Sequence, residues 1–260
     1  MPLLTVKNLK TWYPVRGPLF SKKRFIKAVD DVSFDITPGE SLGLVGESGC
    51  GKSTLGRTLL QLETATAGEA TLAGSDILNC SKRQLMNVRR DIQMIFQDPY
   101  GSLNPRMTIF DTLNEVLIVH STMTPQDRRM EITRLLELVG LKQEQMKRYP
   151  HQFSGGQRQR VGIARALAVS PKLIICDECV SALDVRVQAQ VITLLKDVQQ
   201  KCGVSYLFIS HDLAVVENLC HRIMVMYFGK VVEIGNAQQV CQQPQHDYTK
   251  KLLAAVPSLY

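Results

Sequence analysis

The chain of 260 residues is 45% hydrophobic and carries a formal net charge of +7. This length can bury a sizeable core, which excludes the small peptide folds. No apolar run approaches the roughly 18 residues that span a bilayer, and the N-terminus lacks a basic segment followed by an apolar signal core. We therefore expect one large α/β domain in the cytoplasm, with room for a smaller inserted lobe.

The cysteines and the basic residues are both scattered along the chain. An odd number of cysteines without dense spacing is typical of reduced thiols. Cys176 and Cys179 form a C-x-x-C pattern, but no second pair follows at zinc spacing, which favours two packed thiols. No nucleic-acid-binding motif accompanies the basic residues. The charge therefore favours a solvated surface near anionic lipid or nucleotide.

The first part of the chain predicts short strands at residues 3–6, 28–36 and 41–45. Apolar residues alternate within 28–36, a pattern typical of a half-buried strand. A loop containing proline, glycine and basic residues is expected over 13–27, between the first two strands.

A glycine-rich loop begins where the third strand ends and fits the pattern G-x-x-x-x-G-K-[ST]. A helix is expected over 52–62, so backbone N–H groups and the helix N-terminus would point at phosphate groups. Lys52 would neutralise β/γ-phosphate charge, and the Ser53 hydroxyl would hold Mg²⁺. The sequence therefore predicts a site for a nucleoside triphosphate, formed by Gly46, Glu47, Ser48, Gly49, Cys50, Gly51, Lys52, Ser53 and Thr54.

The middle of the chain changes from strand to helix patterns. A turn-rich connection leads to an expected buried strand over 91–96. The pattern over 104–150 is helical, with Thr124 and Pro125 as a predicted N-cap and first helical residue. Gly140 is expected to end that helix. This region is the candidate inserted helical lobe.

Helices and strands alternate again after the lobe. Helices are expected over 158–169 and 185–201, and strands over 172–177, 205–210 and 222–227. Continuous apolar strands that alternate with helices predict a parallel sheet covered on both faces.

Two further motifs indicate chemistry on the bound nucleotide. Asp177 and Glu178 end an apolar strand, where Asp177 can reach the Mg²⁺ shell and Glu178 can polarise the attacking water as general base. A short polar motif before the helix over 158–169 predicts a second anion site at a helix N-terminus. Its residues are Ser154, Gly155, Gly156 and Gln157.

With the phosphate loop, FSGGQ at 153–157 and the Asp-Glu strand end in this order, the sequence resembles the ATP-binding cassette ATPases over nearly its whole length. The resemblance implies an α/β fold with a P-loop NTPase (RecA-like) core, an N-terminal antiparallel β subdomain and an inserted α-helical signature subdomain. The core is expected over 1–98 and 161–245, the helical subdomain over about 99–160, and a C-terminal tail over 246–260.

Further site residues are implied by the same resemblance. Gln97 resembles the Q-loop glutamine, which contacts Mg²⁺ or water and senses the membrane subunit. His211 resembles the switch histidine at the γ-phosphate, and 181–184 resembles the D-loop. Tyr13 matches the aromatic residue that stacks on adenine. Trp12 is the alternative candidate for this role, and the other interpretation is an aromatic residue that only packs in the core.

Two cysteines lie in these motifs. Cys179 follows Glu178 where the family usually has a small residue or proline, and we expect little effect on hydrolysis. Cys50 lies inside the phosphate loop, so a thiol reagent should inactivate the protein and MgATP should protect it.

The stretches 90–106 and 246–257 look like the oligopeptide, dipeptide and nickel importer subfamily, in particular its second, F-type ATPase. This resemblance implies ATP and Mg²⁺ as cofactors. It also implies a head-to-tail dimer with a second, non-identical ABC ATPase subunit. In this dimer, Ser154, Gly155 and Gly156 would bind the nucleotide of the partner subunit. The resemblance further implies two transmembrane permease subunits, an extracytoplasmic solute-binding protein, and a peripheral place on the cytoplasmic face of the inner (plasma) membrane. The Cys-rich tail of longer relatives is missing, so no iron-sulfur cofactor is expected.

We therefore expect an ATPase that energises peptide import. A nickel or metal-chelate importer ATPase is the alternative within transport. A soluble cassette ATPase acting on DNA or ribosomes is the more distant one, although such proteins usually carry coiled-coil insertions or two cassettes, and no nucleic-acid partner is expected.

Overall fold

The computed structural model describes residues 1–15, 24–98 and 101–255. Its contacts divide the chain into two compact units, one formed by Met1–Arg89 with Ser205–Tyr260 and the other by Arg90–Val204. Within the described residues, every helix is too short or too polar to cross a membrane. The predicted subdomain boundaries at residues 98, 160 and 245 stay a prediction.

Parts of three predicted segments lie outside the described residues. They are residues 16–23 of the expected loop over 13–27, residues 99–100 of the stretch over 90–106, and residues 256–260 of the expected tail.

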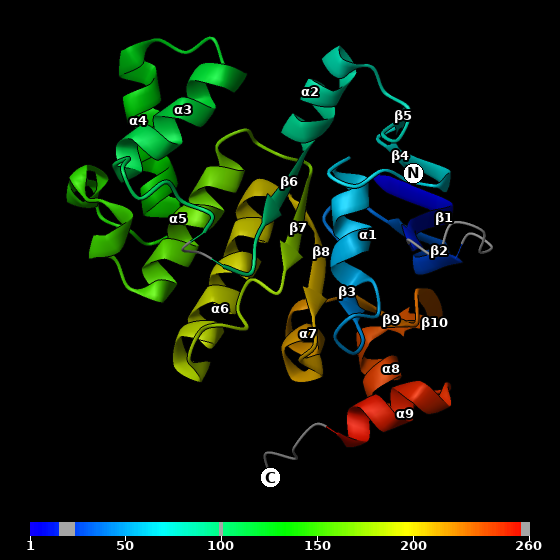
Figure 1. Ribbon diagram of the computed structural model, residues 1–260. Helices are drawn as coiled ribbons and strands as arrows, with labels where there is room; N and C mark the ends of the chain where they lie inside the picture. The colour runs from blue at the N-terminus through cyan, green and yellow to red at the C-terminus, as the bar shows by residue number, and fades with distance from the viewer. Residues whose placement is uncertain (16–23, 99–100, 256–260) are drawn as a thin grey trace. The chain divides into compact units, whose positions relative to one another are not determined.

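The first unit contains an antiparallel sheet at its N-terminal end (Figure 1). Strand β1 (Leu4–Val15) pairs with β2 (Arg24–Ile36) on one side and with β4 (Ala67–Leu72) on the other, and β4 pairs with β5 (Ser75–Asp76). Buried side chains alternate along β4, as expected where one face of a sheet is covered. This sheet confirms the predicted N-terminal antiparallel β subdomain.

The β1–β2 ladder extends further than the sequence predicts. Tyr13 pairs with Ile26, and Val15 pairs with Arg24. The predicted loop over 13–27 is therefore wrong at both of its described ends. The reason is that each strand supplies backbone hydrogen-bond partners to the other, which outweighs the local preference of proline and glycine for turns.

The first unit also contains part of the parallel sheet. Strand β3 (Ser41–Val45) lies between β8 (Ser205–Ser210) and β9 (Arg222–Tyr227) and is parallel to both, and β10 (Lys230–Asn236) is antiparallel to β9. All side chains of β3 and β8 are buried, as the continuous apolar runs predict. The predicted strands over 41–45, 205–210 and 222–227 are confirmed at these bounds.

Several helices of the first unit are not predicted by the sequence or end at another residue than predicted. The helix after the phosphate loop, α1 (Lys52–Leu59), ends before the predicted residue 62. The sequence does not predict α2 (Lys82–Asp91), α7 (Leu213–Leu219), α8 (Ala237–Gln242) or the C-terminal helix α9 (Asp247–Ala254). The last two residues of α2 belong to the second unit. Short helices such as these depend on tertiary contacts more than on local propensity.

The second unit pairs β6 (Ile92–Ile95) with β7 (Leu173–Asp177) in parallel. Its helices include α3 (Ile109–His120), α4 (Pro125–Leu138), α5 (Gly155–Leu167) and α6 (Val185–Cys202).

Helix α4 begins as predicted. The Thr124 hydroxyl accepts a hydrogen bond from the Asp127 backbone N–H at 3.2 Å, and the Asp127 carboxylate accepts one from the Thr124 N–H at 3.3 Å. This reciprocal capping box satisfies two backbone donors, and Pro125 occupies the first helical position. Gly140, with a φ of +71°, follows the end of the helix as expected.

Helix α5 begins three residues earlier than the predicted start at Arg158. Ser154 is its N-cap, because the Ser154 hydroxyl accepts from the Gln157 N–H at 3.3 Å and the Gln157 side chain accepts from the Ser154 N–H at 3.1 Å. Two adjacent glycines hid this start, since glycine disfavours a helix interior but costs less when a cap fixes the first turn. Gly155, Gly156 and Gln157 therefore form the first turn of α5.

Candidate functional site

The phosphate loop joins β3 to α1, as Figure 1 shows. Its glycines are required by close backbone approaches. A Cβ atom on Gly46 would lie 2.2 Å from the Met226 carbonyl oxygen, and one on Gly51 would lie 1.9 Å from the Ala28 carbonyl oxygen. Both glycines also have positive φ values, +154° and +111°, which side chains disfavour. The loop is thus a tight backbone curl held against β9 and β2.

The N-terminus of α1 has the features of an anion site. Its N-cap, Gly51, makes no side-chain cap hydrogen bond, and the first turn contains no acidic residue. The first N–H groups of a helix have no partner inside the helix, and the helix dipole adds partial positive charge there. A phosphate group fits this cradle, because it supplies the oxygen acceptors that an N-cap side chain would otherwise supply.

Lys52 places a buried ammonium group inside the same loop. Its side chain is 4% exposed, and Nζ donates hydrogen bonds to the carbonyl oxygens of Gly46 at 2.7 Å and Glu47 at 2.9 Å. Carbonyl dipoles offset only part of the cost of burying a charge. The Lys52 ammonium therefore favours an anionic ligand at this loop.

Cys50 is buried in the loop, with Sγ 3.9 Å from Lys52 Nζ. Burial raises the pKa of the Cys50 thiol, and the nearby Lys52 charge only partly opposes this. We expect Cys50 to react with a thiol reagent more slowly than the exposed Cys202, because burial limits access to the Cys50 thiol and raises its pKa. The reaction should be slower still with MgATP bound. Peptide mapping after timed alkylation measures both rates, and equal labelling of Cys50 with and without saturating MgATP would contradict the protection.

Tyr13 and Trp12, the two candidates for adenine stacking, have different surroundings. The Tyr13 hydroxyl hydrogen-bonds to Glu63 and to Thr54 of α1, and burial followed by the Glu63 hydrogen bond raises the pKa of Tyr13. The Trp12 ring instead lies under the Lys27 ammonium, 4.5 Å from the ring centroid. Tyr13 is thus the aromatic residue connected to the phosphate-loop helix, and its stacking role stays a prediction.

In the second unit, a carboxylate and an amide meet beyond the ends of neighbouring strands. Glu178 follows β7, Gln97 follows β6, and Gln97 Nε2 donates a hydrogen bond to Glu178 Oε2 at 3.1 Å. Parallel strands end at the same edge of a sheet, which explains the approach. Asp177, one residue before Glu178, is 5% exposed. The structure therefore brings together Gln97 and Glu178, two residues that the sequence predicts as site residues, with Asp177 next to Glu178 in the chain.

The backbone of Glu178 is strained, with a φ of +47°. A left-handed conformation in a residue other than glycine costs of the order of 1–3 kcal/mol and persists where surrounding contacts hold it. The Glu178 carbonyl accepts hydrogen bonds from the Ser181 N–H at 3.1 Å and the Ser181 hydroxyl at 2.9 Å. The half-buried carboxylate beyond this turn accepts the hydrogen bond from Gln97.

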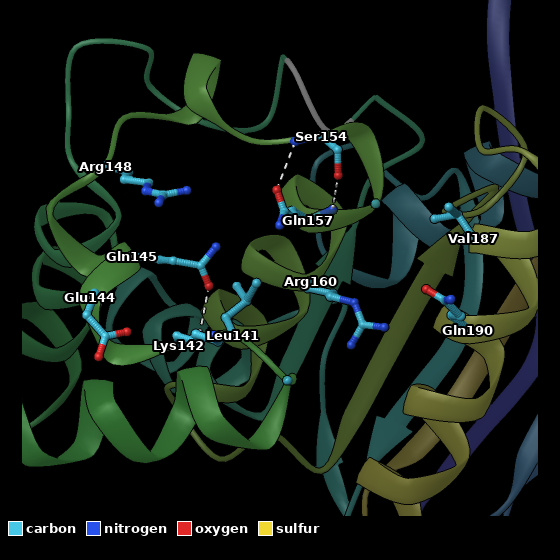
Figure 2. A pocket seen from close by; sticks show the side chains of 12 residues that line it. Leu141, Lys142, Glu144, Gln145, Arg148, Ser154, Gln157, Arg160, Val187 and Gln190 are labelled. Carbon is cyan, nitrogen blue, oxygen red and sulfur yellow. Dashed lines mark hydrogen bonds between the residues drawn. The ribbon is translucent and has the colours of Figure 1, made fainter.

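A cavity of about 600 Å³ opens beside the first turn of α5 (Figure 2). Ser154 and Gln157 lie on one side of it, and Arg148 and Arg160 bring positive charge to its wall. A Cβ atom on Gly156 would lie 2.4 Å from Val187 of α6, so this position also requires glycine. The Ser154 hydroxyl, although it accepts from Gln157, still has a proton to donate. The second predicted anion motif thus has the donors and the charge for a phosphate group.

Comparisons with known proteins decide the family. The model of the family described as "ABC transporter" matches residues 29–181. The chain belongs to the ABC transporter family. Two curated relatives are glutathione import ATP-binding proteins GsiA, from Pectobacterium atrosepticum at 54% identity and from Escherichia coli strain K12 at 55%. Each match covers 98% of this chain and 41% of the relative, so the chain spans about two fifths of the length of these proteins.

Solved structures place the cassette in the same fold. The ATP-binding cassette MJ0796, solved as a dimer in a post-hydrolysis state bound to ADP and Pi, matches with a TM-score of 0.78 at 29% identity, over 90% of this chain and 98% of that one. The structure of cbiO1 from Clostridium perfringens, part of the cbiONQ transporter complex, matches with a TM-score of 0.80 at 24% identity, over 98% and 96%. The predicted ATP-binding cassette fold, an α/β P-loop NTPase core, is confirmed.

The predicted site residues of this cassette fall into two groups. The phosphate loop, Tyr13 and His211 belong to the first unit, whereas Gln97, Asp177, Glu178 and the motif over 154–157 belong to the second. His211 is exposed directly after β8, and Asp212 caps α7 through the Ala214 N–H at 2.9 Å. In the D-loop segment, Asp184 caps α6 through the Val187 N–H at 3.0 Å. The roles of these residues toward a nucleotide stay predictions.

One contact of the cassette was missed by the sequence reasoning. The hydroxyl of Tyr248, in α9, accepts a hydrogen bond from the Glu47 N–H of the phosphate loop at 2.9 Å. In the sequence, the segment around Tyr248 indicates only the subfamily. No local pattern links two residues that are 201 positions apart.

Proposed function

We propose that this cassette binds and hydrolyses ATP and thereby drives import of short peptides, with glutathione as the first solute to test. The observation that carries the ATPase part is the phosphate loop, with its uncapped α1 N-terminus and the buried Lys52 ammonium. The solute rests on the 54–55% identity to proteins named for glutathione import. Glutathione is a tripeptide, so this solute agrees with the peptide class expected from the sequence.

The chain offers residues for the cofactors ATP and Mg²⁺. The phosphate loop fits a polyphosphate, and Ser53, Gln97 and Asp177 carry the oxygen atoms that Mg²⁺ prefers. When bound, Mg²⁺ would neutralise charge on the β- and γ-phosphate oxygens. Tyr13 would bind the adenine ring, with its hydroxyl held by Glu63 and Thr54.

Glu178 would act as the general base. A carboxylate that accepts the proton of the attacking water raises the rate of hydrolysis by about 10²- to 10⁴-fold. The hydrogen bond from Gln97 Nε2 to Glu178 Oε2, at 3.1 Å, helps to fix the position of the Glu178 side chain. Gln97 is therefore a positioning residue for Glu178, and His211 would contact the γ-phosphate.

The proposed partners are a second ABC ATPase subunit, two transmembrane permease subunits and an extracytoplasmic solute-binding protein. The donors at the α5 N-terminus and the basic cavity beside it support a phosphate group bound by another subunit, as in a head-to-tail dimer. The helical segment and Gln97 would pass the closing motion to the permease. The cassette would work at the cytoplasmic face of the membrane.

Uptake in the source cells tests the proposal. Cells whose only gene copy carries Lys52→Ala should lose uptake of labelled glutathione, while cells with Lys230→Ala, which changes an exposed lysine, should keep it. Uptake of labelled dipeptides, longer peptides and nickel is measured alongside. Loss of nickel uptake alone would indicate that the cassette energises metal import. Unchanged uptake of every solute would contradict the importer function.

A further inference from the structure

The C-terminal helix α9 touches the phosphate loop through one tyrosine. Tyr248 lies in the first turn of α9 and is 7% exposed. Its hydroxyl accepts the hydrogen bond from the Glu47 N–H at 2.9 Å. A buried tyrosine usually finds a partner for its hydroxyl, and here that partner is the second residue of the loop.

The peptide group between Gly46 and Glu47 is held from both sides. Its N–H donates to the Tyr248 hydroxyl at 2.9 Å, and its carbonyl oxygen accepts from Lys52 Nζ at 2.7 Å. The two hydrogen bonds share one planar peptide unit, so the orientation of this unit fixes where its carbonyl meets the ammonium. Hydrogen bonds in such a series also polarise one another. Tyr248 thus acts on Lys52 through a single peptide group.

The Tyr248 ring rests on the sheet that carries the loop. Its centroid lies 4.1 Å from that of Tyr227, the last residue of β9. The preceding residue, Met226, has the carbonyl oxygen that Gly46 approaches closely. Tyr248 and the first glycine of the loop are therefore fixed to the same end of β9.

The start of α9 is also fixed, so Tyr248 is not on a loose segment. The Glu233 carboxylate of β10 accepts hydrogen bonds from the backbone N–H groups of Gln245 at 2.9 Å and His246 at 3.0 Å. His246 Nδ1 caps the helix by accepting from the Tyr248 N–H at 3.1 Å. Burial would raise the pKa of Glu233, but the Gln245 hydrogen bond and others lower it overall. The ionised carboxylate holds the helix start against β10.

We propose that Tyr248 is a positioning residue for nucleotide binding, which it supports by orienting the Gly46–Glu47 peptide and, through it, the Lys52 ammonium. The inference rests on the proposed role of the loop in binding ATP. Tyr248 itself needs no contact with the nucleotide. Its hydroxyl replaces the water that would otherwise solvate the Glu47 N–H and so restricts the loop to one arrangement before ATP binds.

The test compares Tyr248→Phe with the matched variant Tyr227→Phe, both in the full chain. Each substitution removes one hydroxyl and keeps the ring–ring packing, but only the first removes the acceptor of the Glu47 N–H. We expect Tyr248→Phe to speed hydrogen–deuterium exchange in the phosphate-loop peptide without nucleotide. It should also raise the Kd for MgATP about two- to tenfold, the effect of losing one hydrogen bond, and raise KM while kcat changes little.

The result that would overturn the inference is the same loop exchange and the same MgATP affinity in Tyr248→Phe as in Tyr227→Phe. A lower melting temperature and a lower kcat in Tyr248→Phe, with KM unchanged, would also overturn it. That outcome indicates that Tyr248 only stabilises the fold. Failure of the wild-type protein to bind MgATP would contradict the proposed function instead. In that case the exchange comparison without nucleotide still shows whether Tyr248 orders the loop.

Discussion

Replacing Glu178 with glutamine is expected to reduce steady-state ATP hydrolysis by about 10²- to 10⁴-fold, the usual contribution of a general base. An amide cannot accept the proton of the attacking water at neutral pH, but it has nearly the shape of the carboxylate. Its oxygen can still accept the hydrogen bond from Gln97 Nε2, which measures 3.1 Å in the native protein. MgATP affinity should therefore stay within about twofold of the native value. A tenfold weaker affinity would require the loss of about 1.4 kcal/mol of binding free energy.

The measurements are phosphate release, MgATP affinity and dimer formation under ATP. Since hydrolysis would reopen the dimer, the variant should accumulate as an ATP-bound dimer in size-exclusion chromatography. Glu137→Gln is the matched control, because Glu137 is an exposed glutamate of α4 in the same unit. Native rates of phosphate release in Glu178→Gln would refute the role of Glu178 as the base.

Replacing Lys52 with alanine is expected to weaken MgATP binding about 10- to 100-fold, as expected from losing a hydrogen bond to a charged group. The substitution removes the ammonium that now donates to the Gly46 and Glu47 carbonyl oxygens. It leaves the glycines and the α1 N-terminus in place. Binding should therefore weaken without disappearing, whereas Glu178→Gln should affect only turnover.

Isothermal titration with MgATP measures this effect. Lys230→Ala, at an exposed lysine of the same unit, should bind like the native protein. A melting temperature close to the native one would show that Lys52→Ala remains folded. Normal MgATP affinity in the Lys52 variant would contradict the assignment of the phosphate loop.

The residue pattern is enough to predict the site residues of the cassette and most of its regular elements. The phosphate loop and the Asp177-Glu178 pair are predicted from the sequence because their spacing is local and their residue types suit phosphate and Mg²⁺. The Thr124 cap was found for the same reason, since a capping box lies within four residues. The buried strands β3 and β8 were found because continuous apolar runs suffice to define them.

The tertiary structure decided what depends on partners far away in the sequence. The extension of β1 and β2 needs the facing strand, and the contact of Tyr248 with Glu47 spans 201 positions. The approach of Gln97 to Glu178 likewise depends on the parallel pairing of β6 with β7. Hydrogen bonding and packing act between neighbours in space, whereas sequence periodicity reports only neighbours along the chain. For this reason the sequence predicts the site residues, and only the folded chain shows what holds them in position.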